Sequence, residues 1–232
     1  MIDCLYLLSL KIIVGNIDGN IVEKKGKINT LDIDNNSKED IKYFLEKDLL
    51  SDFINSDEDI KGIVVECYTC SSNNLELMKI FLKYYPDYVD VYNTSYFGET
   101  PLHNACLLQK YEVVNLLLEY DANPNAQDFE NNETPLMCSS FHNYIDITYL
   151  LLECDADTNI INKYGDTALH MACRNENVEI VKLLLQYGAN PNIENKFQGS
   201  NTPLQIAIKK NNVEIEIILK NYIIEWFKKN KC

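Results

Sequence analysis

One short phrase recurs along this chain at a nearly constant spacing. Each copy opens with a threonine followed by Pro-Leu or Ala-Leu, and the four threonines are Thr100, Thr134, Thr167 and Thr202. Their separations are 34, 33 and 35 residues. Self-similarity at a period of this length predicts a solenoid, in which repeated units stack and each unit packs against its neighbours.

Each copy carries two helical patterns joined by a short connection. In the third copy, the apolar residues within 169–173 mark one face of a first helix, and those within 178–185 form a broader band on a second helix. Gly188 follows, where a left-handed residue can end the second helix. Asp121 and Asp155 stand at the same place in the preceding copies, and we expect the same backbone conformation there at some energetic cost. The pattern predicts an all-α chain of helix-turn-helix units.

The repeated phrase and the apolar run that follows it resemble the ankyrin repeat family. The phrases are "GETPLHNAC" at 98–106, "NETPLMCSS" at 132–140, "GDTALHMAC" at 165–173 and "NTPLQIAI" at 201–208. The runs are "VVNLLLEY", "ITYLLLEC", "IVKLLLQY" and "VEIEIILK". Period, phrase, small pair and turn coincide over about residues 95–222. The resemblance implies an ankyrin-repeat solenoid, all-α with short hairpin fingers.

The repeats divide the chain into three parts. Four clear units begin near residues 95, 129, 162 and 196 within 95–232, and the last one ends in a long capping helix whose Trp226 we expect to cover the open end of the stack. A degenerate unit is predicted over 58–94, because Gly62 aligns with Gly98 at an offset of 36 residues. Residues 1–57 form a divergent N-terminal region, either a further degenerate repeat or a cap with a polar outer face.

The net charge and the cysteines indicate which partners and which cellular compartment to expect. The net charge of −14 repels phosphate, so nucleic acid is not an expected partner. The apolar start of the chain carries Asp3 and Lys11, and we predict neither a signal peptide nor a membrane span. Among the 8 cysteines, Cys106 and Cys173 fall where a small buried residue is needed. We therefore expect free thiols and a cytoplasmic location, or the host cytosol if the chain is an effector.

No catalytic, metal-binding or cofactor-binding site is predicted. The resemblance implies that Thr100 with His103, and Thr167 with His170, make hydrogen bonds within and between units. Met137 and Gln205 replace the histidine in the other two units, so no imidazole set runs along the array. The CxxC motif of Cys67 and Cys70 lacks two further ligands at zinc spacing. We interpret the motif as structural.

Two classes of position remain free to contact a partner protein: the finger tips and the ends of the first helices. The finger residues are Tyr96, Phe97, Phe129, Tyr164 and Phe197. The helix-end residues, which pass from apolar to basic along the array, are Leu107, Leu108, Phe141, His142, Arg174, Asn175, Lys209 and Lys210. Aromatic residues and arginine are enriched at protein interfaces. Two structural alternatives stay open: the finger aromatics pack on the neighbouring finger, or Leu107 and Leu108 are buried.

The sequence therefore predicts a non-catalytic interaction module that binds another protein through its concave face and fingers. In the third unit we also expect Lys163 and Asp166 to be available to a partner, in addition to Tyr164, Arg174 and Asn175. One alternative is a viral or bacterial effector that captures a host protein. Another is an enzyme whose small catalytic segment is residues 1–57, a segment that contains no histidine. We expect a monomer, with self-association through Trp226 and the terminal helix as the alternative.

Overall fold

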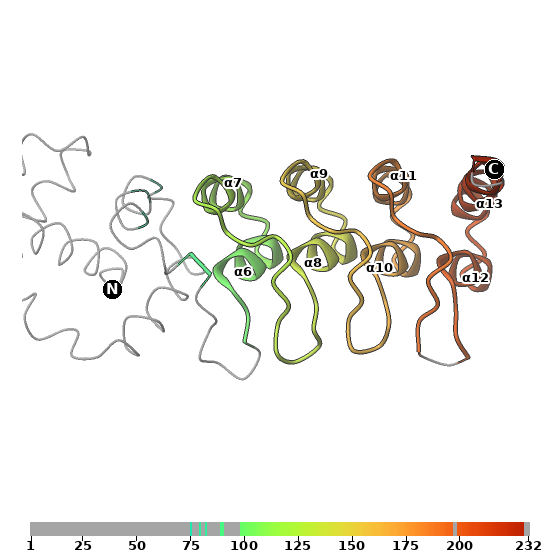
Figure 1. The fold of residues 1–232 in the computed structure, drawn as a ribbon, viewed down its shortest axis with the longest axis horizontal. Coiled ribbons are helices and arrows are strands. Elements are labelled where there is room, and N and C mark those ends of the chain that lie inside the picture. Colours follow the sequence, from blue (N-terminus) through green and yellow to red (C-terminus); the bar gives the residue numbers. More distant parts are fainter. Residues whose placement is uncertain are drawn as a thin grey trace, which may run out of the picture.

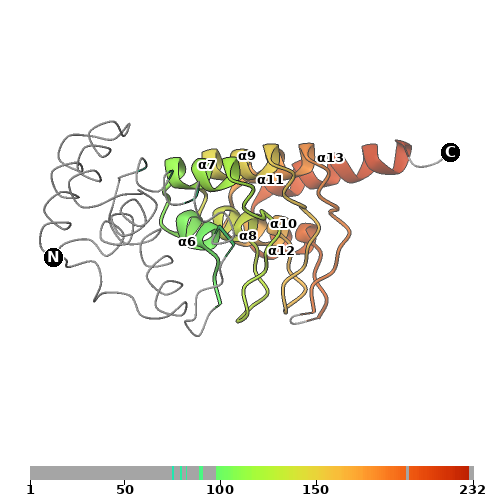
Figure 2. The same ribbon diagram turned by 60° about the vertical axis from the view of Figure 1, so that its left-hand side comes forward.

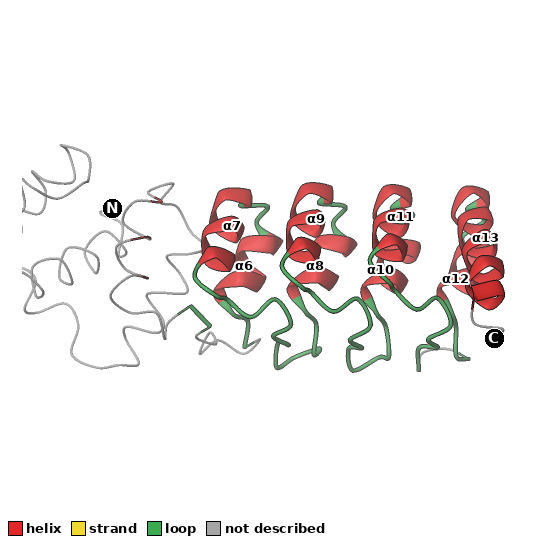
Figure 3. Cartoon of the chain, turned by 45° about the horizontal axis from the view of Figure 1, so that its top comes forward, coloured by secondary structure: helices red, strands yellow, loops and turns green. Residues whose placement is uncertain are grey.

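The computed structural model describes Leu75, Lys79, Leu82, Val89, Asp90, residues 98–196 and residues 199–229. Within these residues there are four helix pairs and no strand (Figure 3). The first helices of the pairs are α6 (Pro101–Leu107), α8 (Pro135–Phe141), α10 (Ala168–Arg174) and α12 (Pro203–Lys209). The second helices are α7 (Tyr111–Glu119), α9 (Ile145–Glu153), α11 (Val178–Gln186) and α13 (Val213–Lys229). The predicted all-α solenoid is confirmed.

The helices form two layers, with the loops between units projecting from the array as fingers (Figure 1). Each first helix contacts the first helix of the next unit, and each second helix contacts the next second helix. The leucine after each cap threonine lies inside: Leu102, Leu136 and Leu169 are at most 1% exposed. Leu82 belongs to the same core although it lies in the region predicted as a degenerate unit. The predicted boundaries after residues 57 and 94 fall outside the described residues.

The threonine of the repeated phrase begins each first helix. Its side chain accepts a hydrogen bond from the backbone N–H three residues on, as at Thr134, where the donor is Met137. Three units close a capping box, in which a side chain at that third position accepts the N–H of the threonine. Gln205 does this in the last unit, with its Oε1 2.7 Å from the N of Thr202. Because two N–H groups are satisfied, a helix of only seven residues is stable in this context.

The two histidines of the phrase join one unit to the next. The Nδ1 of His103 accepts the N–H of Thr100 at 3.2 Å, so its Nε2 carries the proton and donates to the carbonyl oxygen of Glu133 at 2.9 Å. His170 repeats this arrangement and donates to the carbonyl oxygen of Asn201 at 3.1 Å. The predicted structural role of both histidines is confirmed. Desolvation lowers the pKa of each imidazole below its usual value of 6.5.

A second ladder of hydrogen bonds runs between the turns that end the second helices. The side-chain oxygen of Asn125 accepts the N–H of Asp157 in the next unit at 2.7 Å, and that of Asn159 accepts the N–H of Asn190 at 2.8 Å. Asp90 does the same for the N–H of Asn123 at 2.9 Å. The ladder therefore extends from the clear repeats into the preceding segment.

The turns at the ends of the second helices adopt the conformation expected from the sequence. Gly188 has a φ of 84°, and Asp121 and Asp155 have φ values of 62° and 60°. The left-handed region is strained for residues with a Cβ, so Asp121 and Asp155 are less favourable than glycine at the ends of their second helices. The left-handed conformation reverses the chain and brings the next unit onto the stack.

The expected role of Trp226 as a cover for the open end of the stack is wrong. Helix α13 has 17 residues and α11 has 9, so the last part of α13 extends beyond the helix against which it packs. Figure 2 shows this part projecting from the array. Trp226 lies on it, 38% exposed, with its ring edge-to-face with Phe227.

The buried histidines predict a specific pH dependence of stability. Their folded-state pKa lies below the unfolded value, so the unfolded chain binds more protons between the two values, and the native protein loses stability as the pH falls below about 6.5. The double variant H103Q/H170Q keeps a capping side chain, as Gln205 does, but has neither imidazole. We expect it to unfold about 1–3 kcal/mol more easily at pH 7.5, with a smaller difference from the native protein at pH 5.

Urea unfolding of both proteins at the two pH values measures this difference, in which the carboxyl groups common to both proteins cancel. The control is H142Q, because His142 is solvent-exposed; we expect a change within about 0.5 kcal/mol at either pH. A difference between H103Q/H170Q and the native protein that does not change with pH would contradict the assignment.

Candidate protein-interaction surface

Every unit turns from its first to its second helix through a left-handed residue. These residues are Gln109, Asn143, Glu176 and Asn211, with φ values between 55° and 60°. The short turn places the last residues of each first helix at the surface, side by side along the array. We call these positions the helix-end surface: Leu108, Phe141, His142, Arg174, Asn175, Lys209 and Lys210. Leu107 differs from them, because it is partly buried and packs against the core.

The first two units contribute the apolar half of the helix-end surface. Leu108 is 47% exposed and Phe141 is 43% exposed. The ring of His142 lies edge-on to Phe141 at 5.0 Å and stacks with Tyr144 at 5.5 Å and 17°. The three rings therefore form one ordered group at an exposed turn. Of the alternatives left open by the sequence, burial holds in part for Leu107 and does not hold for Leu108.

The last two units contribute the polar and basic half. Arg174 donates from Nη2 to the Oδ2 of Asp166 at 2.7 Å, and its side chain is 35% exposed. Asn175 donates to the carbonyl oxygen of Met171 at 3.2 Å. Lys209 donates to the side-chain oxygen of Asn201, a neutral group, so its charge is not compensated there. Lys210 is exposed. The positive charge available to a partner therefore lies mainly on the two lysines.

Asp166 does not have the role expected from the sequence. It is 2% exposed, and its second carboxylate oxygen accepts the side-chain N–H of Asn195 at 2.8 Å. The prediction that Asp166 is available to a partner is therefore wrong. Arg174 balances a buried carboxylate, which gives it a structural function beside any contact with a partner.

The described finger aromatics contact the neighbouring finger. A Cβ added at Gly98 would collide with the ring of Phe129, so this ring covers the glycine of the preceding finger while 65% of the side chain stays exposed. Tyr164 donates from its hydroxyl to the Oδ1 of Asn131 at 3.3 Å, and the Nζ of Lys163 lies 5.0 Å from its ring centre. Tyr96, Phe97 and Phe197 lie outside the described residues. Packing between fingers, left open by the sequence, is thus observed at both described positions.

The possible metal ligands and nucleophiles among the described residues are dispersed or buried. Within them, no three His, Cys, Asp or Glu side chains are placed to hold a metal ion. Burial raises the pKa of the Cys173 thiol to about 12, and it raises those of Cys106 and Cys138 as well. These cysteines are free thiols in the core and are protonated at neutral pH. The described helices include none that is long and apolar enough to cross a bilayer.

A group of exposed apolar residues on the second helices was not predicted from the sequence. Tyr111, Ile145 and Tyr149 are 43%, 42% and 47% exposed. The exposure of Tyr111 could have been predicted from the sequence. The buried residues of α7 are Val113, Val114, Leu116 and Leu117, and at 3.6 residues per turn Tyr111 lies outside the stripe that they form. Tyr144 was missed because it lies in the turn, between the two helical patterns.

Comparison with known proteins agrees with the architecture. A family model described as ankyrin repeats (3 copies) matches residues 31–128, 67–162 and 126–195, which together exceed half of the chain. The ankyrin repeat protein FPV014 of fowlpox virus is 34% identical over 94 residues, covering 40% of this chain and 21% of the relative. The ankyrin repeat protein L371 of Acanthamoeba polyphaga mimivirus is 35% identical over 83 residues, covering 36% and 11%.

One relative has the name of an enzyme. Glycerophosphocholine phosphodiesterase gde1 of Schizosaccharomyces pombe is 36% identical over 75 residues, which cover 32% of this chain and 7% of the relative. In all three proteins the matched segment is about a fifth of the length or less. The similarity therefore extends over the repeats and leaves most of each relative unmatched.

The ion pair of Arg174 predicts a loss of stability in its absence. The variant R174M retains the apolar stem but leaves the Asp166 carboxylate buried without its cation, and we expect a loss of about 1–2 kcal/mol of unfolding free energy. Adding D166N removes the buried charge and should recover part of that loss. Urea unfolding measures both. K210M is the matched control, expected within about 0.5 kcal/mol of the native protein. An R174M variant as stable as K210M would contradict the role of the pair.

Proposed function

The chain belongs to the ankyrin-repeat family, and on that premise we propose that it acts without catalysis, as a module that holds a partner protein on its helix-end surface. The observation that carries the proposal is an exposed apolar pair, Leu108 and Phe141, continued along the array by the basic Lys209 and Lys210. Clustered exposed apolar groups with a polar border are typical of protein interaction sites.

Rigidity supports this function. Leu108 and Phe141 end helices that are capped by threonine at one end and closed by a short turn at the other. The stacked rings of Phe141, His142 and Tyr144 restrict one another. Binding therefore orders few side chains, and more of the contact energy contributes to affinity.

The partner that fits this surface has an apolar patch beside acidic groups. Its apolar patch would meet Leu108 and Phe141, and its carboxylates would meet Lys209, Lys210 and the exposed part of Arg174. The finger aromatics Phe129 and Tyr164, with Tyr96, Phe97 and Phe197 of the same class, extend the proposed contact. Asn175 and His142 supply polar groups between the two halves. Leu107 supports Leu108 from the core side.

The viral relatives favour a second candidate of the same kind. Two of the similar proteins are ankyrin repeat proteins of fowlpox virus and of a mimivirus. In an effector, the same surface would capture a host protein, and the chain would work in the host cytosol. A cytoplasmic location and a monomeric state remain predictions for either case.

Catalysis has little support in the described array. His103 and His170 are buried with both ring nitrogens hydrogen-bonded, and the thiols of Cys106 and Cys173 are buried in the core. The relative named as a phosphodiesterase matches over only 7% of its own length. We therefore assign the array to recognition. The predicted alternative of a catalytic segment at residues 1–57 lies outside the described residues.

The double variant L108S/F141S tests the proposal. We expect it to lose at least about tenfold in affinity for a partner, because central apolar contacts contribute most of the energy of an interface. The partner is first identified by cross-linking the native protein in its own cell and by mass spectrometry, and affinity is then measured with the purified partner. The melting temperature should stay within about 3 °C of the native value.

The matched control is I217S/I224S on α13, whose side chains are 53% and 52% exposed and lie away from the helix-end surface. This control should bind as the native protein does. Unchanged affinity of L108S/F141S would refute the helix-end surface as the binding site.

A further inference from the structure

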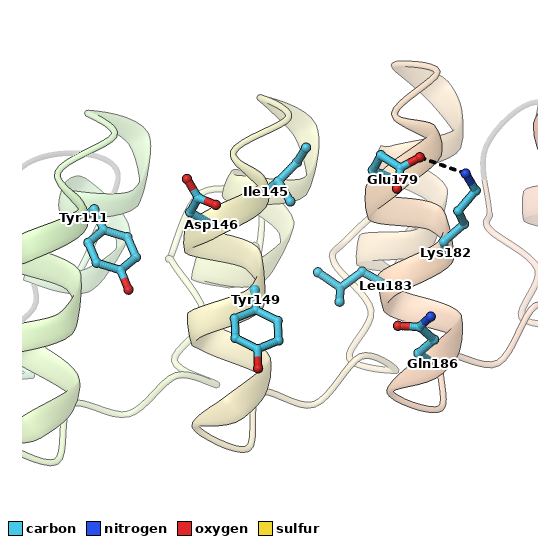
Figure 4. A pocket seen from close by; sticks show the side chains of 8 residues that line it. All are labelled: Tyr111, Ile145, Asp146, Tyr149, Glu179, Lys182, Leu183 and Gln186. Atoms are coloured by element: carbon cyan, nitrogen blue, oxygen red, sulfur yellow. Dashed lines mark hydrogen bonds and ion pairs between the residues drawn. The ribbon is translucent and has the colours of Figure 1, made fainter.

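The solvent side of the second helices carries a groove that the proposed function does not use. The groove has a volume of about 450 Å³ and is lined by Tyr111, Ile145, Asp146, Tyr149, Glu179, Lys182, Leu183 and Gln186. Figure 4 shows Tyr111 pointing from α7 towards α9, and Leu183 pointing from α11 towards α9. A second hollow of about 350 Å³ shares Tyr111, Ile145 and Asp146 with it. We call the first of these hollows the outer groove.

The outer groove is lined by both apolar and polar side chains, and its apolar part is formed by Tyr111, Ile145, Tyr149 and Leu183. Tyr111, Ile145 and Tyr149 are each more than 40% exposed. Tyr149 lies edge-on to Tyr187 at 6.4 Å, and the hydroxyl of Tyr187 donates to the carboxylate of Glu153. These contacts hold the rings of Tyr149 and Tyr187 in place, although both side chains are exposed and lie outside the hydrophobic core. Exposed and pre-ordered aromatic side chains are typical anchors for a partner.

Asp146 and Glu179 line the outer groove beside one cation, Lys182, and the second helices around the groove carry further carboxylates. The second residue of every second helix is a carboxylate: Glu112, Asp146, Glu179 and Glu214. Glu119, Glu153 and Glu216 bring the total on α7, α9, α11 and residues 213–221 to seven carboxylates, against two lysines. Lys182 lies 2.7 Å from Glu179 and 3.6 Å from Glu214, and Lys220 pairs with Glu216. Both lysines are thus engaged by carboxylates, and a negative excess faces the solvent.

The acidic residues alone have a structural explanation, because a carboxylate near a helix N-terminus interacts favourably with the helix dipole. That explanation does not cover the apolar column beside them, which Tyr111 and Ile145 form at the first position of α7 and α9. Nor does it cover Tyr149, one turn further along α9. Helix stability therefore explains the carboxylates but does not explain why exposed apolar side chains line a groove beside them.

The usual spacing of packed helices matches the period of a helix laid across them. Packed helices lie about 8–10 Å apart, and an α-helix advances about 10.5 Å in seven residues. Apolar residues at positions i and i+7 of a crossing helix would therefore meet successive second helices. Lysine or arginine beside them would meet the carboxylate at the second position of each helix.

We propose that the outer groove binds a basic amphipathic helix of a partner protein. The charge of the groove selects this occupant. A second copy of the chain docked groove to groove would bring one acidic face against another, and an anionic lipid surface would be repelled in the same way. The outer groove is acidic and the helix-end surface is basic in its last units, so the two surfaces suit partners of opposite charge.

The test uses synthetic peptides of about 18 residues, or five helical turns, labelled with fluorescein. The first has leucine at i, i+3, i+4 and i+7 with lysine elsewhere. The second has the same leucine pattern with glutamate in place of lysine, and the third has the composition of the first in scrambled order. Fluorescence anisotropy with the full chain measures affinity. We expect the first peptide to bind at least about tenfold more tightly than either of the others.

Variants locate the binding. I145S/Y149S should weaken binding of the leucine–lysine peptide about tenfold, and D146N/E179Q should weaken it and reduce its dependence on salt. L108S/F141S is the matched control, with similarly exposed apolar side chains, and should bind the peptide as the native chain does. Failure of the proposed function and failure of the outer-groove proposal are therefore distinguishable, because the two pairs of substitutions affect different surfaces. If I145S/Y149S unfolds at a lower temperature than the native chain, D146N/E179Q decides the result.

Three outcomes would overturn the proposal. Equal binding of the scrambled peptide would mean that charge alone attracts it. Equal binding by the native chain and both groove variants would place the peptide elsewhere. A dimer in sedimentation that Y149S dissociates would show that a second copy is the occupant.

Discussion

No helix pair of this chain can bury its own apolar face, and every other feature of the array follows from that constraint. Leu102, Leu136 and Leu169 reach full burial only between neighbouring units. The same geometry lets His103 donate to the carbonyl oxygen of Glu133 in the next finger. The hydrogen-bonded turns at Asn125 and Asn159 add a second connection. Each unit is therefore held on two sides, by packing and by hydrogen bonds to its neighbours.

This coupling turns short helices into a rigid support for exposed side chains. A helix of seven residues is unstable alone, but here its ends are capped and its sides are covered. The exposed residues at its end are thus fixed relative to those of the next unit. The array offers two such rows, one at the ends of the first helices and one on the second helices. In the proposed function, their opposite charges would distinguish one partner from another.

The period of the threonines was sufficient to predict the helices, and the resemblance to the ankyrin repeat family added the role of the histidines, because these features are local or repeat at a fixed offset. The burial of Asp166 was not predictable, since it depends on Arg174 and Asn195 arriving from other parts of the chain. The same limit applies to Phe129, whose contact with Gly98 is made between fingers. Trp226 was misplaced because the sequence does not show how far α13 continues past α11, the helix against which it packs.

The exposure of the helix-end residues was predictable from their position in the repeat, and that of Tyr111 from the 3.6-residue period of α7. The groove that these second-helix residues line was not predictable, because it depends on how neighbouring units stack. Hydrogen exchange of the native chain with and without its captured partner tests whether the partner is held on the helix-end surface. We expect slowed exchange in the turns at 107–109, 141–143 and 209–211, which exclude the residues that line the outer groove. Turns that exchange as fast in the complex as in the free chain, with protection confined to other parts of the array, would contradict it.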